Sequence, residues 1–151
     1  MGLVELYSMN LKVIVIDKNH QRRAVLLNNI KVSKLCHTAV PFSGRQQALS
    51  HIEKSFNPDD YYLCFLNLEP DTRACHDFLN SIKATPFSKN VLVVILCLKP
   101  LLFAQEFRSE SQVLSVLRSS VSIEEINQNG IKALNRILSV EEYSFQARLA
   151  V

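Results

Sequence analysis

The stretch Lys12-Val13-Ile14-Val15-Ile16-Asp17-Lys18-Asn19 decides the fold that this sequence predicts. Its four consecutive β-branched aliphatic residues are typical of a strand buried on both faces, as in a parallel sheet. A carboxylate ends the run, and a polar segment that can open a helix follows. Functional groups collect at the carboxyl ends of the strands in such sheets, so Asp17, Lys18 and Asn19 mark the place where a site is expected.

Strand and helix patterns alternate along the rest of the chain. Further strands are predicted over residues 36–40, 61–66, 90–98 and 112–117, with Pro41 ending the second strand. Helices are predicted over residues 19–31, 43–56, 71–84 and 122–138, with a short helix within 101–111. Five successive β-α units predict an α/β protein, a flavodoxin-like, doubly wound (βα)5 domain with a central parallel five-stranded sheet.

Local signals support the helix boundaries. Asn19 is a good N-cap, Asp71 or Thr72 can cap the third helix, and the segment Ser122 to Glu125 is a capping box. On the first helix, an inward stripe of Ala24, Leu27 and Ile30 is predicted, and Val25 and Leu26 widen it.

The composition indicates one ordinary globular domain. The 151 residues are 48% hydrophobic and 21% charged, with a net charge of +3. The basic residues are scattered, so nothing points to nucleic acid, and the pairs Arg22-Arg23 and Lys31/Lys34 are interpreted as a solvated helix surface. No apolar run reaches the roughly 18 residues of a membrane span, and the N-terminus has no signal-peptide pattern. A cytoplasmic location is expected.

Motifs for catalysis or cofactor binding are absent from the sequence. The four cysteines form no C-x-x-C pair and are interpreted as small buried residues in a reducing compartment. There is no glycine-rich phosphate loop, no paired histidine spacing for a metal and no nucleophile elbow. The sequence therefore predicts no enzyme, no metal and no cofactor.

The segment from Val13 to Leu27 resembles the first strand and helix of a response-regulator receiver domain, an aliphatic strand followed by an acidic turn and a helix with Arg and Leu. The resemblance covers roughly residues 11–138, where element order carries it, and it implies a CheY-like fold. Residues 1–10 are then interpreted as an N-terminal extension or tag remnant. Residues 139–151 are interpreted as a C-terminal linker helix toward a missing downstream domain.

The resemblance also implies a degenerate phosphorylation pocket. An active receiver has two acids after the first strand that hold magnesium, an Asp after the third strand that accepts the phosphoryl group, a Thr or Ser after the fourth, and a Lys-Pro pair after the fifth. Here Asp17 keeps the first acid, Lys18 replaces the second, Asn67 stands at the acceptor position, Cys97 lies near the hydroxyl position, and Ser119 replaces the Lys.

These replacements remove the chemistry of an active receiver. An amide such as that of Asn67 cannot form an acyl phosphate, and the ammonium of Lys18 repels a divalent cation. Three arrangements of Lys18 remain open, in which it pairs with Asp17, bonds to Asn67 or points to solvent. Glu69, two residues after Asn67, is the one acid that could substitute as acceptor, and it is expected to face solvent.

The sequence therefore predicts a phosphorylation-independent pseudo-receiver. Its layout is similar to the regulatory or dimerisation domain at the front of NtrC-like flagellar master regulators, which are bacterial transcription regulators. The run Leu98-Lys99-Pro100 before a shortened fourth helix and the segment 115–120 carry this similarity. Expected partners are a second copy, as a homodimer, or a downstream ATPase and DNA-binding region, with no direct contact of this domain with nucleic acid or membrane.

Three alternatives remain open at this point. The chain is a stand-alone two-component signalling adaptor that binds a partner protein, or a receiver phosphorylated at an unconventional acceptor, or a flavodoxin-like cofactor protein.

Overall fold

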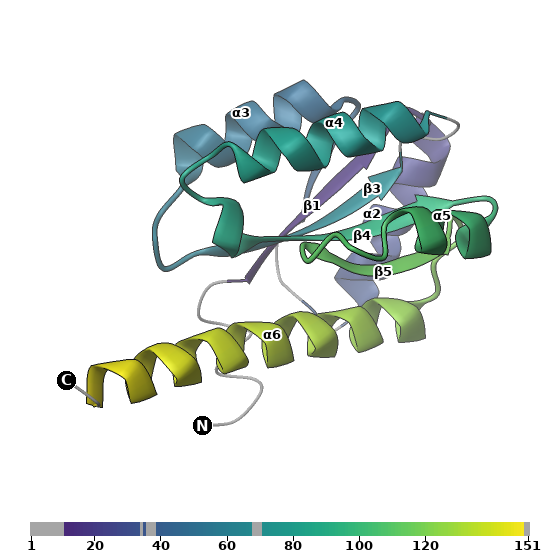
Figure 1. Cartoon of the computed structure of the whole chain (residues 1–151). Coiled ribbons are helices and arrows are strands. Elements are labelled where there is room, and N and C mark those ends of the chain that lie inside the picture. The colour runs from purple at the N-terminus through teal and green to yellow at the C-terminus, as the bar shows by residue number, and fades with distance from the viewer. Residues whose placement is uncertain (1–10, 34, 36–38, 68–70, 150–151) are drawn as a thin grey trace.

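Five parallel strands form the central sheet of the computed structural model (Figure 1). They are β1 (Leu11–Asp17), β2 (Ala39–Phe42), β3 (Tyr61–Asn67), β4 (Val91–Cys97) and β5 (Val113–Arg118). Their order in the sheet is β2-β1-β3-β4-β5, which is the flavodoxin-like order of a doubly wound fold. The structure describes residues 11–33, 35, 39–67 and 71–149, with side chains as far as Ser139.

Helices cover both faces of this sheet. They are α2 (His20–Val32), α3 (Arg45–Ser55), α4 (Thr72–Lys83), α5 (Pro100–Glu106) and α6 (Ile123–Leu149), with a 3-10 turn, η1, at Ser88–Asn90. Helices α3 and α4 lie on one face, α2 and α6 lie on the other, and α5 lies at the end of the sheet toward which the strands point (Figure 1). The predicted CheY-like (βα)5 architecture is confirmed.

The aliphatic run of β1 is buried from both sides because its residues alternate between two cores. Ile14 and Ile16 pack in the core under α3 and α4. Val13 and Val15 pack in the core under α2 and α6. Successive side chains of a strand point to opposite faces, so the middle of a strand between two helical layers has to be apolar at consecutive positions, as Val13 to Ile16 are.

The second strand differs from its prediction. Pro41 was expected to end it, whereas β2 runs from Ala39 to Phe42 with Pro41 opposite Val15 of β1. Because β2 is an edge strand, the missing N–H of Pro41 removes no hydrogen bond from the middle of the sheet. The predicted residues 36–38 lie outside the described part of the chain.

The structure confirms the predicted helix caps. The Asn19 side chain accepts a hydrogen bond from the Arg22 N–H at 2.9 Å, and Asp71, rather than Thr72, caps α4 by accepting from the Ala74 N–H at 3.1 Å. Ser122 and Glu125 form the capping box, each side chain accepting from the other's N–H at 3.1 Å.

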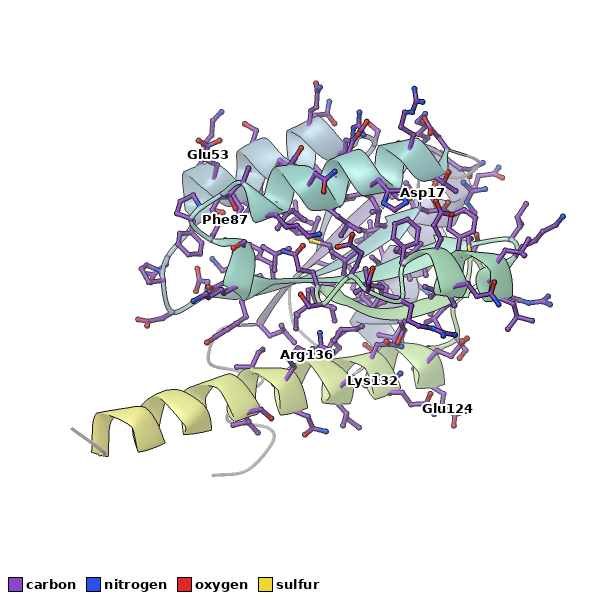
Figure 2. All side chains as sticks on the ribbon, viewed as in Figure 1. Asp17, Glu53, Phe87, Glu124, Lys132 and Arg136 are labelled. Atoms are coloured by element: carbon purple, nitrogen blue, oxygen red, sulfur yellow. The ribbon has the colours of Figure 1, made fainter. Side chains whose placement is uncertain are left out.

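Helix α6 is longer than predicted. It continues without a break from Ile123 to Leu149, so the segment interpreted as a linker helix prolongs the fifth helix as far as Leu149. Lys132 and Arg136 reach from α6 toward the sheet (Figure 2), where Lys132 donates to Ser115 Oγ at 3.0 Å and Arg136 donates to the Ser111 carbonyl. Among the described helices, none combines the length and the apolar character that crossing a bilayer requires. Residues 1–10, interpreted as an extension, lie outside the described chain.

We expect Cys64 to resist thiol reagents in the folded protein. Burial raises the pKa of the Cys64 thiol to about 12, and only the thiolate reacts. At pH 8, iodoacetamide should label Cys64 much more slowly in native protein than in protein unfolded in guanidinium chloride, with mass spectrometry reporting the site. Equal rates in both states would contradict the buried position of β3.

Candidate functional site

The candidate site lies at the carboxyl ends of β1 and β3. Asp17 and Asn67 end these neighbouring strands and are opposite each other in the register. The chain order reverses between β1 and β3, and this switch point is where ligands bind in open α/β sheets. The folding pattern therefore brings two of the five sequence-predicted residues to the expected place.

The Asp17 carboxylate is clamped by an arginine. Asp17 is 2% exposed, and both of its oxygens accept hydrogen bonds from Arg22, with Nε to Oδ2 and Nη2 to Oδ1 at 2.9 Å each. The backbone N–H of Asn19 also donates to Oδ1, at 2.8 Å. A bidentate guanidinium is the strongest ordinary partner for a carboxylate, because two charge-assisted bonds fit its planar fork.

Two further contacts join the start of α2 to the end of β1, next to the pair of Arg22 and Asp17. Arg23, the next residue of α2, donates from Nη1 to the backbone carbonyl of Asp17 at 2.7 Å. Asn19 caps the same helix through its side chain. The end of β1 and the first turn of α2 are therefore joined by several hydrogen bonds around one buried carboxylate.

Asn67, Ser119 and Cys97 meet on the other side of the site. Asn67 is 2% exposed and donates from Nδ2 to Ser119 Oγ at 3.2 Å. The Ser119 N–H donates to the Cys97 carbonyl at 3.1 Å, and the buried Cys97 thiol lies 3.8 Å from the Leu117 carbonyl. Four of the five predicted site residues, Asp17, Asn67, Cys97 and Ser119, thus converge at this end of the sheet.

Lys18 does not join this cluster. It is exposed and makes no ion pair or hydrogen bond with any residue that the structure describes. Of the three arrangements left open by the sequence, the exposure of Lys18 matches the one in which it points to solvent. Glu69, the other acid considered, lies outside the described residues.

Sequence reasoning missed Arg22, which was interpreted as part of a solvated helix surface. A signal was present, because the Asn19 cap makes Arg22 the third residue of α2. A long side chain in the first turn of a helix can reach back to the end of the preceding strand. The charge pattern alone does not show which of the two neighbouring arginines, Arg22 or Arg23, pairs with the Asp17 carboxylate.

The donor set does not fit a magnesium ion. Magnesium requires several oxygen ligands in an octahedral arrangement, and here the one carboxylate of the cluster already accepts three hydrogen bonds. The amide of Asn67 uses its nitrogen on Ser119, and the second acidic position is Lys18. No group of three His, Cys, Asp or Glu side chains suited to a metal occurs among the described residues.

Comparisons with solved structures place the fold among receiver domains. A response regulator receiver protein from Dyadobacter fermentans superposes with a TM-score of 0.71 at 12% identity, covering 82% of this chain and 98% of that one. The phosphoreceiver-containing C-terminus of Escherichia coli RcsC gives 0.63 at 18% identity, over 87% of this chain and 49% of that one.

A structure named adenylate cyclase from Rhodopirellula baltica is also similar, with a TM-score of 0.68 at 17% identity over 91% of this chain and 98% of that chain. At these identities the likeness concerns the fold. No protein-family model matches the sequence, and no curated protein matches it.

We expect Arg22→Ala to destabilise the domain by about 1–3 kcal/mol, because it leaves a buried, charged acceptor without its partner. Arg73→Ala is the matched control, since Arg73 lies exposed in the first turn of α4, and should change stability by less than about 0.5 kcal/mol. Urea unfolding followed by circular dichroism measures both.

A double-mutant cycle measures the interaction free energy between Asp17 and Arg22. With Asp17→Asn already present, the further change Arg22→Ala should have a smaller effect than it has alone. Equal effects in the two backgrounds would show that the ion pair does not stabilise the fold.

Proposed function

We propose that this chain is a pseudo-receiver, a regulatory domain with the receiver fold that acts through protein contacts and without phosphorylation. The observation that carries the proposal is the bidentate clamp of Arg22 on Asp17 at the β1 switch point. The guanidinium supplies the positive charge that a receiver takes from a metal ion. Because this cation is a side chain of the protein itself, it keeps the Asp17 carboxylate paired at all times.

The acceptor position supports the same proposal. Asn67 ends β3 where the receiver resemblance places the phosphoacceptor, and its amide donates to Ser119. A carboxamide has no anionic oxygen to attack a phosphoryl donor. A non-catalytic role at this site follows from the chemistry of the side chains.

The finer proposal is that the domain regulates or dimerises a bacterial transcription regulator of the flagellar enhancer-binding type in the cytoplasm. Its support is the sequence similarity in Leu98-Lys99-Pro100 and residues 115–120, together with the short α5 that follows the first of these. In that case ATPase and DNA-binding functions belong to other parts of the full-length protein. Homodimerisation or contact with such a region is the proposed role of this domain.

Phosphorylation chemistry tests the proposal directly. Incubation with acetyl phosphate and magnesium should leave the intact mass unchanged, and calorimetric titration with magnesium should show no binding at millimolar concentration. A receiver with the complete acidic set is the positive control. A stable phosphoadduct on any residue, including the unconventional acceptor Glu69, would overturn the proposal.

Self-association is tested by light scattering over a concentration series. Helix α5 exposes Leu101 to 84%, with Leu102 exposed beside it, and exposed apolar side chains of this size favour an interface. We expect dimers at high micromolar concentration, which Leu101→Glu weakens and Val32→Glu on α2 leaves unchanged. A strict monomer throughout the series would remove homodimerisation and leave contact with other proteins.

A further inference from the structure

A cavity of about 460 Å³ lies at the amino ends of β3 and β4, at the opposite end of the sheet from Asp17. Tyr61 begins β3, and Val91 begins β4 directly after η1. In Figure 1 this is the end of the sheet away from α5. Helices α4 and α6, η1 and the segment just before β5 supply the rest of the lining, so five parts of the fold meet around one hollow.

Hydrogen bonds fix the segments around this cavity. The Gln112 carbonyl accepts from the Val93 N–H at 2.8 Å, and Gln112 Nε2 donates to the Ser88 carbonyl at 3.1 Å. Arg136 of α6 donates to the Ser111 carbonyl. The segment before β5 is therefore joined to β4, η1 and α6, and a cavity formed in advance requires little reorganisation when a ligand binds.

Three cations line the cavity, and no acidic residue does. They are Lys83, Lys89 and Arg136. Lys83 is paired with the Glu110 carboxylate. Lys89 and Arg136 are exposed, and neither forms an ion pair with a carboxylate in the described part of the chain. Two cations without a carboxylate partner favour a ligand with two negative charges, such as a phosphate monoester.

The remaining lining calls for more than a bare phosphate. Val91, Leu92 and Ile137 are buried apolar side chains at its base, which suit the flat face of an organic ring. Gln112 also lines the cavity and is 8% exposed, and its Oε1 has no hydrogen-bond partner among the described residues. A buried acceptor without a partner is rare, and an N–H or O–H group of a ligand would provide one.

We propose that this cavity binds a mononucleotide. The phosphate pairs with Lys89 and Arg136, the base lies against the apolar side chains, and a donor group of the nucleotide bonds to Gln112 Oε1. The cavity volume falls within the range of about 300–1,000 Å³ that is usual for small-molecule sites. The inference goes beyond the proposed function and does not rest on it, because the cavity shares no residue with the site around Asp17.

The probes are AMP, GMP, CMP and UMP, each titrated separately into the full chain and followed by calorimetry. The buffer contains salt at about 0.15 M, so that non-specific attraction to surface charges is screened. We expect saturable binding of at least one of these nucleotides. The matching nucleoside and inorganic phosphate should each bind at least about tenfold more weakly, because each keeps only part of the contacts.

Two matched pairs of variants locate the site. Lys89→Gln should weaken nucleotide binding by about tenfold, as expected for a lost charge-assisted contact. Lys54→Gln on α3 should leave binding unchanged, because Lys54 is also exposed and does not line the cavity. Arg136→Gln should weaken binding similarly, and its control is Arg73→Gln on α4. Lys89 makes no hydrogen bond or ion pair with any described residue, so its replacement leaves the fold intact.

Three outcomes overturn the proposal. The first is the absence of saturable binding for all of the nucleotides. The second is equal affinity for a nucleotide and for inorganic phosphate, which would make the cavity a simple anion site. The third is an equal loss for Lys89→Gln and Lys54→Gln, which would show that the nucleotide binds to surface charge in general and not to this cavity.

Discussion

The ion pair between the buried carboxylate of Asp17 and the partly exposed guanidinium of Arg22 is the constraint on which the carboxyl end of the sheet depends. A carboxylate at the end of β1 is almost fully buried, and a buried charge is unfavourable unless it is paired and hydrogen-bonded. Arg22 supplies two bonds and Asn19 a third. The same contacts determine how α2 leaves the sheet, and therefore where the outer face of α2 lies. The charge balance at the switch point and the start of α2 therefore depend on the same interaction.

Two kinds of surface result from this arrangement. The switch point, where an open α/β sheet usually binds its ligand, is filled by side chains that satisfy one another, with Arg22 on Asp17 and Asn67 on Ser119. Beside it, the apolar side chains of Val25 and Leu98 remain exposed. Polar groups that already bond to one another have few hydrogen-bonding positions left for a small ligand. Covering exposed apolar side chains is favourable because it removes apolar surface from water. This balance supports the proposal that the domain recognises a protein and performs no chemistry on a phosphate.

The fold alone does not distinguish these roles. Solved structures named as receiver proteins and one named as an adenylate cyclase superpose on this chain to a similar degree. The same layered sheet can support unrelated functions, because the scaffold is held together by its two apolar cores while the activity depends on a few side chains at the strand ends. For this chain those side chains are an arginine-bound carboxylate and an amide, and they carry the functional argument.

The sequence by itself determined most strands, most helix ends and the amide at the end of β3, because these depend on residues that are close together along the chain. A run of β-branched residues specifies a doubly covered strand, Asn19 and Ser122 specify helix starts, and Asn67 is an amide in any fold. Tertiary structure decided the rest. The inward stripe predicted for α2 was wrong at Ala24 and Val25, which are exposed, because packing of Leu26 and Ile30 against the sheet sets the rotation of the helix. The pairs Asn67–Ser119 and Asn29–Val121 join residues 52 and 92 positions apart, which come together only because parallel strands end at one edge of the sheet.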